Sequence, residues 1–235
     1  MNILIPMAGA GSRFEQVGYT FPKPLIEVEG KPMIQKVVEN LNFGDEHRHI
    51  FIVQKEHYDR YALNYLLPLI TPNCEIIQVE KVTEGAACTA LLAKEFIDND
   101  EGLMIANSDQ IIDWIETPQP LYERNIDGGV YVFNATHPKW SFVKVDETNR
   151  VTEVAEKKPI SDIATTGIYF WKRGKDFVRC AEQMIDKNIR VNNEFYIAPV
   201  FNEIIPEDGK TIGIEYVNKM WGIGTPEDLE TYLKR

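Results

Sequence analysis

A glycine-rich loop and two cationic side chains stand close together near the start of the chain. The loop reads AGAGSRF, and PKPL follows shortly after it. Gly9 and Gly11 come directly after an apolar run, so the backbone can turn tightly and point several N–H groups at one place. Arg13 offers a planar fork of donors and Lys23 a compact positive charge, a combination that suits a polyphosphate. The pattern therefore indicates a site for a phosphorylated ligand.

The loop matches neither of two common phosphate-binding signatures. A P-loop would carry Gly-Lys-Ser/Thr, but Gly11 is followed by Ser12 and Arg13. A dinucleotide-binding fingerprint would carry a third glycine, but Phe14 occupies that position. Taken alone, the loop is equally compatible with a plain strand-to-helix turn that carries an exposed arginine.

The PKPL motif favours the functional interpretation of the loop. Pro22 and Pro24 restrict the backbone on both sides of Lys23 and predict an extended conformation for it. A stiffened backbone that carries a flexible cation makes sense if the ammonium group must meet an anion at a set position. We therefore expect Lys23 to act together with Arg13.

The first half of the chain predicts the elements that position this loop. Apolar runs of β type alternate there with segments of helical periodicity. We expect strands over 2–8, 49–54, 74–80 and 103–109, and helices over 32–41, 56–67 and 85–97. Such alternation predicts a mostly parallel sheet with helices on both faces.

The second half has a different pattern. Strands follow one another without helical spacers, which predicts antiparallel additions to the sheet. We expect these strands over 128–136, 141–147, 151–157 and 165–172, and a separate strand over 211–217. One helix is expected around Phe177, and a C-terminal helix begins with Thr225 as N-cap and Pro226 in its first turn. Since no linker or repeat interrupts the chain, we expect a single α/β domain over 1–235, with its site along the carboxyl ends of the parallel strands.

The composition restricts the classes of function. The chain has 235 residues and a net charge of −11, which argues against nucleic-acid and anionic-membrane partners but not against a small phosphate held by local basic groups. No stretch reaches the roughly 18 apolar residues of a spanning helix, and the N-terminus lacks the basic region of a signal peptide. Cys74, Cys88 and Cys180 show no metal-like spacing, so we expect reduced thiols and a cytoplasmic location.

The segments LIPMAGAGSRF and FPKPLIEVEGKPMI resemble the signature of the nucleotidylyltransferases that activate sugar 1-phosphates and related phosphates. The resemblance continues in order through EGAACTALLA, NSDQ, EKKP and WGIGTPEDL. It implies a Rossmann-like, three-layer α/β/α fold. Within the family the sequence is most similar to a capsule-biosynthesis branch that includes cytidylyltransferases, which implies CTP as the favoured nucleotide.

The resemblance also implies roles for particular residues. Arg13 and Lys23 would be catalytic, and Asp109 within NSDQ would ligate Mg²⁺. The residues implied in nucleotide binding are Ala8, Gly9, Ala10, Gly11, Ser12, Arg13, Lys23, Glu84, Gly85, Ala86 and Asn107. The residues implied in acceptor binding are Glu156, Lys157, Lys158, Thr166 and Gly167. The partners would be an NTP and a small phosphorylated acceptor.

The sequence departs from the family pattern at two places. Gly222 stands where the family usually has a second metal-binding aspartate. Either Asp109 holds Mg²⁺ together with waters and phosphate oxygens, or Glu194 or Glu215 takes over as a ligand. Asp109 is also compatible with a simple cap of the following helix. The double lysine of EKKP leaves open which of the two meets the acceptor phosphate.

The expected reaction is Mg²⁺-dependent transfer of a nucleotidyl group to a sugar 1-phosphate or small phosphate ester. Pyrophosphate would be released, and the product would serve capsule or surface polysaccharide synthesis. A nucleotide-sugar-dependent glycosyltransferase is an alternative, but such enzymes usually carry Asp-x-Asp where this chain has NSDQ. A non-catalytic nucleotide-binding regulatory relative is compatible with Gly222. The oligomeric state stays open, with a homodimer as one alternative.

Overall fold

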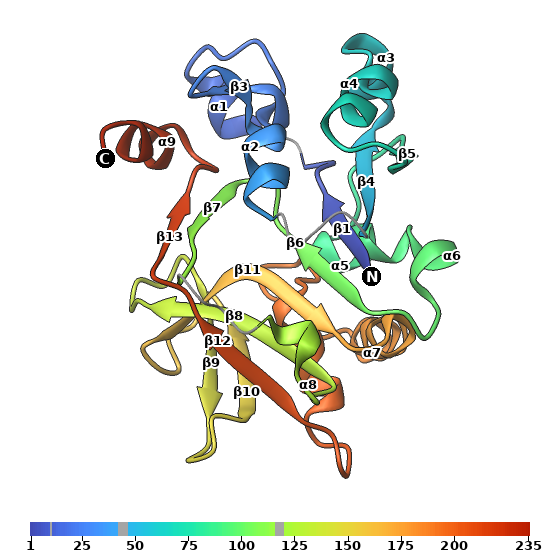
Figure 1. Cartoon of the computed structure of the whole chain (residues 1–235), viewed down its shortest axis with the longest axis vertical. Coiled ribbons are helices and arrows are strands. Elements are labelled where there is room, and N and C mark those ends of the chain that lie inside the picture. Colours follow the sequence, from blue (N-terminus) through green and yellow to red (C-terminus); the bar gives the residue numbers. More distant parts are fainter. Residues whose placement is uncertain (10, 42–46, 116–119) are drawn as a thin grey trace.

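The computed structural model describes residues 1–9, 11–41, 47–115 and 120–235. Within these ranges the largest sheet has nine strands, and two small two-stranded sheets accompany it (Figure 1). The strands of the large sheet are β1 (Asn2–Pro6), β4 (Arg48–Gln54), β5 (Glu75–Val79), β6 (Leu103–Ala106), β8 (Gly128–Asn134), β9 (Ser141–Val145), β10 (Val151–Glu156), β11 (Ile163–Trp171) and β12 (Ile212–Tyr216). The small sheets pair β2 (Glu27–Val28) with β3 (Lys31–Pro32), and β7 (Gln110–Asp113) with β13 (Lys219–Gly222).

The helices are short and connect these strands. They are α1 (Ser12–Gln16), α2 (Met33–Asn40), α3 (Lys55–Arg60), α4 (Leu63–Ile70), α5 (Ala86–Leu91), α6 (Lys94–Ile97), α7 (Gly174–Asp186), α8 (Phe201–Ile204) and α9 (Pro226–Leu233), with 3₁₀ turns η1 (Lys23–Leu25), η2 (Leu121–Glu123) and η3 (Ala198–Val200). Thr225 caps α9 as predicted, because its Oγ1 accepts from the Asp228 N–H over 3.1 Å. Among the described helices, none has the length and apolar character to cross a membrane.

Four parallel strands form the part of the sheet on which the site is built. β1 pairs with β4 on one side and with β6 on the other, and β5 continues beyond β4. After β1 the chain adds β4 and β5 on one side, and it later returns to add β6 on the other side. Open α/β sheets bind ligands at such a topological switch point, where the strand order reverses. β11 pairs antiparallel with β6, and β8, β9 and β10 extend this half. The predicted mostly parallel sheet with antiparallel additions is confirmed, and β12 runs parallel to β8.

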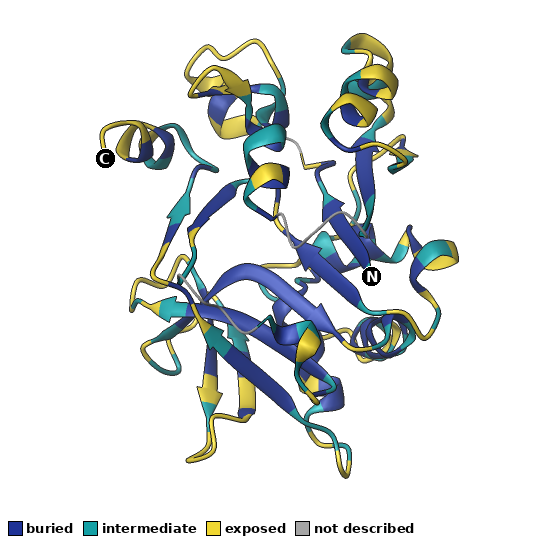
Figure 2. Ribbon diagram, in the orientation of Figure 1, coloured by how far each residue is buried: buried dark blue, intermediate teal, exposed yellow. Residues whose placement is uncertain are grey.

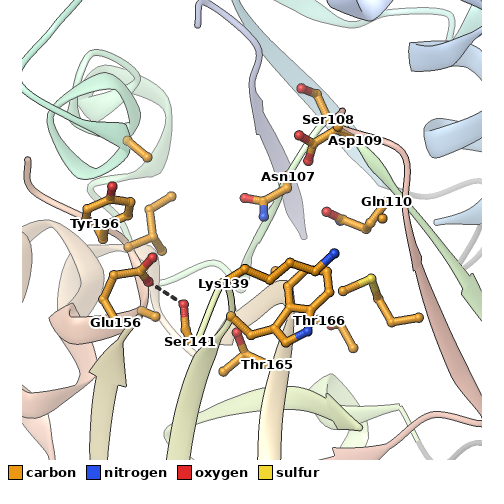
Figure 3. Close-up of a pocket in the computed structure, with 18 of the residues that line it drawn as sticks. Asn107, Ser108, Asp109, Gln110, Lys139, Ser141, Glu156, Thr165, Thr166 and Tyr196 are labelled. Carbon is orange, nitrogen blue, oxygen red and sulfur yellow. Dashed lines mark hydrogen bonds between the residues drawn. The ribbon is translucent and has the colours of Figure 1, made fainter. Parts of the chain in front are cut away.

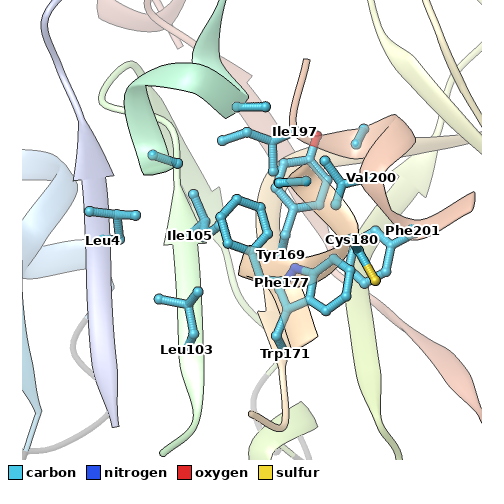
Figure 4. Close-up of a cluster of buried hydrophobic side chains, with 14 of the residues drawn as sticks. Leu4, Leu103, Ile105, Tyr169, Trp171, Phe177, Cys180, Ile197, Val200 and Phe201 are labelled. Carbon is cyan, nitrogen blue, oxygen red and sulfur yellow. The ribbon is translucent and has the colours of Figure 1, made fainter. Parts of the chain in front are cut away.

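Helices cover both faces of the sheet, and burial follows the alternation of side chains along β1. Ile3 and Ile5 pack with residues of α2 and α4, whereas Leu4 packs on the other face with residues of α5 and α7. Figure 2 shows the central strands buried and the outer sides of the helices exposed. In the cluster that contains Leu4, Trp171 stacks on Phe201 with ring centroids 4.3 Å apart (Figure 4). The three-layer α/β/α arrangement is therefore confirmed.

Two predicted helices are interrupted. The segment 56–67 forms α3 and α4 because Ala62 adopts a left-handed φ of 50° between them. The turn lets Leu63 and Leu67 of α4 reach the core, whereas α3 buries no residue. The segment 85–97 likewise forms α5 and α6, separated by a tighter turn with i→i+3 hydrogen bonds.

Three further corrections concern the neighbourhood of the site. Lys23 is not extended: it begins η1, which is closed by a 2.8 Å bond from the Leu25 N–H to the Pro22 carbonyl. The strand predicted to reach Asp109 ends earlier, so Asp109 lies in the loop after β6. The interpretation of Asp109 as a helix cap is wrong, because β7 follows directly at Gln110. The sequence pattern did not predict β7 or its partner β13.

Candidate active site

A cavity of about 500 Å³ lies at the carboxyl ends of β1 and β6 (Figure 3). Its walls come from the loops that follow these strands, from the middle of β11 and from the connection between β13 and α9. Nine of the predicted site residues line it, namely Arg13, Lys23, Ala86, Asn107, Asp109, Glu156, Lys157, Thr166 and Gly167. The structure thus brings together residues that stand far apart in the sequence.

The other predicted residues lie outside the cavity wall. They are Ala8, Gly9, Gly11, Ser12, Glu84, Gly85 and Lys158, while Ala10 lies outside the described residues. The glycine-rich loop reaches the cavity through Arg13. Gln54, at the end of β4, donates from Nε2 to the carbonyls of Ala8 and Gly9 over 2.9 and 3.1 Å and so fixes the start of the loop. Sequence reasoning missed Gln54, although its place at the end of a predicted strand was a usable signal.

One ion pair joins the lysine of PKPL to the aspartate of NSDQ. Lys23 Nζ lies 2.7 Å from Asp109 Oδ2, and both side chains keep partial exposure, 22% and 27%. Asp109 packs closely on Gly224, since a Cβ at that position would lie 2.3 Å from Oδ2. The Ile223 N–H donates to the Asp109 carbonyl over 2.9 Å. Three segments distant in sequence therefore meet at Asp109.

The EGAACT segment is bonded to a second part of the cavity wall. The Phe195 N–H donates to the Glu84 carbonyl over 2.9 Å, and the Ala87 N–H donates to the Phe195 carbonyl over 3.0 Å. Arg190 pairs with the Glu84 carboxylate over 2.6 Å and lies over the Phe195 ring. Tyr196, the next residue, lines the cavity. The two segments therefore form one unit joined through the backbone.

Largely buried polar groups stand at the end of the cavity away from Asp109 (Figure 3). Ser141 Oγ donates to the Glu156 carboxylate, and Thr165 Oγ1 lies 3.1 Å from Tyr169 Oη. Burial raises the pKa of Glu156, and the hydrogen bond from Ser141 opposes that rise. A carboxyl group can accept a hydrogen bond when ionised and donate one when protonated. Sequence reasoning missed Ser141, Thr165 and Tyr169 as site residues, because they lie within ordinary strands.

The structure separates the two lysines of EKKP. Lys157 lines the cavity, whereas Lys158 is exposed outside its wall. Lys157 has a left-handed φ of 53°, and its N–H donates to the Trp140 carbonyl over 3.1 Å. Its Nζ lies 2.5 Å from Tyr196 Oη. Of the two lysines, Lys157 is the one that faces the cavity.

Gly222 stands where the family usually has an aspartate, so the carboxylates near that position matter. Among the described residues, the carboxylates that line the cavity are those of Asp109, Glu156 and Asp228. Asp228 pairs with Lys139 over 2.9 Å. Its Oδ2 lies 3.7 Å from the place where a Cβ on Gly222 would stand. A carboxylate therefore lies next to the position that the family usually fills with aspartate.

The donor set fits a magnesium ion that arrives with a nucleotide. Within the described part of the chain no group of three or more metal-ligating side chains is gathered. Mg²⁺ commonly uses one or two carboxylates and takes its other ligands from water and phosphate. Asp109 offers such a carboxylate at the cavity. Glu194 and Glu215 lie outside the wall, and Glu215 pairs with Arg124 over 3.1 Å.

Comparison with known proteins agrees with this geometry. A sequence model described as nucleotidyl transferase matches residues 3–229, which is nearly the whole chain. The chain belongs to the nucleotidyl transferase family.

Curated relatives of this family member are longer than the chain. The bifunctional protein GlmU of Methanocaldococcus jannaschii is 26% identical over 237 residues, which cover 97% of this chain and 52% of the relative. The low-salt glycan biosynthesis nucleotidyltransferase Agl11 of Haloferax volcanii is 25% identical over 238 residues, covering 97% of this chain and 64% of the relative. The chain spans about half the length of the first relative and somewhat more of the second.

Solved structures share the fold of this nucleotidyl transferase. The nucleoside-diphosphate-sugar pyrophosphorylase from Vibrio cholerae has a TM-score of 0.85 and 26% identity, covering 99% of this chain and 100% of that one. The inositol-1-phosphate CTP transferase from T. maritima has a TM-score of 0.73 at 16% identity, covering 100% and 96%. The α/β architecture is therefore that of nucleotidyl transferases.

Replacing Gly224 should disturb the ion pair at Asp109. In Gly224→Ala the new Cβ would lie 2.3 Å from Asp109 Oδ2, so the carboxylate must move away from Lys23. We expect the affinity for an Mg²⁺–nucleoside triphosphate to fall about tenfold or more, measured by calorimetry. Gly222→Ala is the matched control, because its Cβ approaches the Trp140 ring to 3.3 Å and the Asp228 carboxylate to 3.7 Å. Equal affinities for the two variants would contradict the role given to Gly224.

Glu156 gives the protein a pH dependence that is measurable without substrate. Because burial raises the pKa of its carboxyl above the usual 4.5, the folded protein keeps a proton that the unfolded chain has released. This stabilisation is complete below pH 4.5 and is lost as the pH rises through the raised pKa. Glu156→Gln cannot ionise, so we expect it to gain stability relative to the wild type between about pH 4 and pH 7 in urea unfolding.

A control for this measurement lies on the same strand. Lys144 lowers the pKa of the exposed Glu153 carboxyl, so Glu153→Gln should show no such gain with rising pH. A difference between the wild type and Glu156→Gln that stays constant over the range would exclude a raised pKa at Glu156.

Proposed function

We propose that this protein transfers the nucleotidyl group of an NTP to a phosphorylated acceptor. An oxygen of the acceptor phosphate forms a bond to the α-phosphorus of the NTP, the bond from that phosphorus to the oxygen bridging to the β-phosphate breaks, and pyrophosphate leaves. The proposal is carried by one cavity, which has Arg13, Lys23 and Asp109 in its wall together with Glu156 and Lys157. The wall carries positive charge at two positions, Arg13 with Lys23 and, separately, Lys157. This arrangement suits two phosphorylated substrates in one cavity.

Positioning and charge neutralisation provide the catalysis in this proposal. The acceptor oxygen is already an anion, so no strong general base is required, and the difficulty lies in aligning two anions. The amides of the glycine-rich loop and Arg13 hold the triphosphate. Lys23 neutralises charge at the α-phosphate, and Lys157 draws in the acceptor phosphate. Glu156 bonds the polar body of the acceptor.

Mg²⁺ completes the site in this proposal. Asp109 would hold the ion, with phosphate oxygens and waters as further ligands. When bound, Mg²⁺ neutralises phosphate charge and aligns the reacting oxygens. Lys23, which pairs with Asp109 and keeps partial exposure, would then be available to pair with a phosphate oxygen.

We propose CTP as the favoured nucleotide and a surface glycan precursor as the product. The resemblance of the sequence to the capsule branch supports CTP, and the T. maritima CTP transferase has the same fold. The relative Agl11 is named for glycan biosynthesis, and the V. cholerae neighbour for nucleoside-diphosphate sugars. These names support a sugar 1-phosphate or a related phosphate as the acceptor, used in the cytoplasm.

Thermal unfolding with a panel of nucleotides tests the proposal. We expect CTP with Mg²⁺, at about a hundred times its Kd, to raise the melting temperature by roughly 5–10 °C, and UTP, dTTP, GTP and ATP to raise it less. Stabilisation by nucleoside diphosphates or nucleotide sugars alone would favour a glycosyltransferase. Binding of an NTP without pyrophosphate release over an acceptor panel would favour a non-catalytic relative.

Substitution of the charged residues tests the mechanism. Arg13→Ala and Lys23→Ala should each lower kcat for pyrophosphate release about 10²–10³-fold, the effect of removing one preorganised charge. Asp109→Asn should abolish Mg²⁺-dependent turnover with the melting temperature preserved. Lys55→Ala, at an exposed position of α3, is the control. Activity within threefold of the wild type would remove the substituted residue from the mechanism.

A further inference from the structure

The space beside Gly222, where the family usually has an aspartate, is occupied in this structure. Gly222 is the last residue of β13. A Cβ at this position would lie 3.3 Å from the Trp140 ring and 3.7 Å from Asp228 Oδ2. The first distance is shorter than ordinary van der Waals contact, so a side chain here would have to share space with the ring. The glycine therefore suits its surroundings, and the carboxylate beside it belongs to Asp228.

The first turn of α9 places Asp228 in the cavity wall. β13 leads into this helix (Figure 1), and the Thr225 Oγ1 accepts from the Asp228 N–H over 3.1 Å. This cap fixes the turn, so that Asp228 lines the cavity while the neighbouring Glu227 is exposed outside its wall. An acidic residue in the first turn stabilises a helix by itself. Glu227 carries the same charge in the same turn, so it separates that general effect from a role in the cavity.

Asp228 and Asp109 border the same short connection between β13 and α9. Gly222 lies beside Asp228 Oδ2, and a Cβ on Gly224 would lie 2.3 Å from Asp109 Oδ2. Two residues of chain span at most about 7 Å. Glu156, the other carboxylate that lines the cavity in the described part of the chain, stands at the end away from Asp109. Asp109 and Asp228 are therefore the carboxylates that share one stretch of the cavity wall.

Each of these two carboxylates already holds a cation. Lys23 Nζ lies 2.7 Å from Asp109, and Lys139 Nζ lies 2.9 Å from Asp228. The Asp109 and Asp228 side chains are 27% and 31% exposed. Ion pairs between partly exposed side chains contribute little to stability. Each ammonium group therefore marks a position where the wall attracts a cation, and a divalent ion can compete for that position.

We propose that Asp228 is the second carboxylate of the Mg²⁺ site, together with Asp109, in place of the aspartate that the family usually has at the position of Gly222. This inference rests on the proposed nucleotidyl transfer, because the ion enters with the NTP. Mg²⁺ commonly uses one or two protein carboxylates and completes its ligands with water and phosphate. The role is kept in this chain, but α9 carries it instead of β13. Lys139 is the group that competes with the ion for Asp228.

Binding of Mn²⁺, which prefers the same oxygen ligands as Mg²⁺, tests the inference without turnover. The protein is titrated with Mn²⁺ in the absence of nucleotide and again with saturating CTP, and the free ion is followed by electron paramagnetic resonance. We expect Asp228→Asn to weaken Mn²⁺ binding about tenfold or more in both titrations, because a charged ligand is lost. Glu227→Gln removes the same charge from the same turn, and it should bind Mn²⁺ as the wild type does.

Replacing Lys139 separates a metal ligand from a structural ion pair. Lys139→Met removes the competing ammonium group, so it should tighten Mn²⁺ binding to the nucleotide-free protein about threefold. If the pair were merely structural, Lys139→Met and Asp228→Asn would change Mn²⁺ binding in the same direction. Because the pair is partly exposed, both variants should melt within about 2 °C of the wild type.

Moving the carboxylate back to β13 gives a second test. The double variant Gly222→Asp with Asp228→Asn carries its aspartate where the family usually has it, and it should recover most of the Mn²⁺ affinity that Asp228→Asn loses. A double variant that folds and binds Mn²⁺ no better than Asp228→Asn alone would contradict the inference.

Three results of the titrations overturn the inference. The first is that Asp228→Asn binds Mn²⁺ as the wild type does in both titrations. The second is that Lys139→Met and Asp228→Asn weaken binding alike. The third is that the wild type binds no Mn²⁺ in either titration.

Failure of the inference differs from failure of the proposed function. If an NTP is turned over while Mn²⁺ binding depends on Asp109 but not on Asp228, nucleotidyl transfer stands and the inference falls. If Mn²⁺ binding to the nucleotide-free protein depends on both carboxylates but no NTP is turned over, the proposed function falls and the metal site stands.

Discussion

The contact between Asp109 and Gly224 is the constraint on which the cavity depends. The carboxylate occupies space that any larger residue at position 224 would fill. In that place it receives Lys23 from the turn after the glycine-rich loop, while the Asp109 carbonyl receives the N–H of Ile223. The loop after β1, the loop after β6 and the connection before α9 thus converge. Without this close approach, Lys23 and Asp109 would not meet in the wall of one cavity.

The cavity gathers positive charge on a protein whose net charge is −11. Three lysines face the cavity, and each already has a partner there. Lys23 pairs with Asp109, Lys139 with Asp228, and Lys157 with the hydroxyl of Tyr196. These partners limit the repulsion that clustered cations would otherwise cause. In the proposed reaction a phosphate would displace these partners, and the positive charge would already be in place for it.

Much of this structure could be predicted from the sequence, for identifiable reasons. The parallel strands are continuous apolar runs and the loop carries turn-forming glycines, so both have local signals. The break at Ala62 was missed because tertiary packing of Leu63 and Leu67 overrides a continuous helical pattern. β7 and β13 were missed because they are short and pair over more than 100 residues. Ser141 and Thr165 carry no local signal, because they lie within ordinary strands and distant parts of the chain complete the cavity around them.

The backbone hydrogen bonds that join Glu84 and Ala87 to Phe195 constrain how the specificity of this protein can evolve. They join the segment that resembles a base-lining loop to the residue before Tyr196, which lines the cavity. A substitution that reshapes one segment must be accommodated by the other within the same pair of hydrogen bonds. In the proposed function, preference for a new base and preference for a new acceptor therefore cannot change independently. Descendants with altered specificity should carry paired changes on both segments.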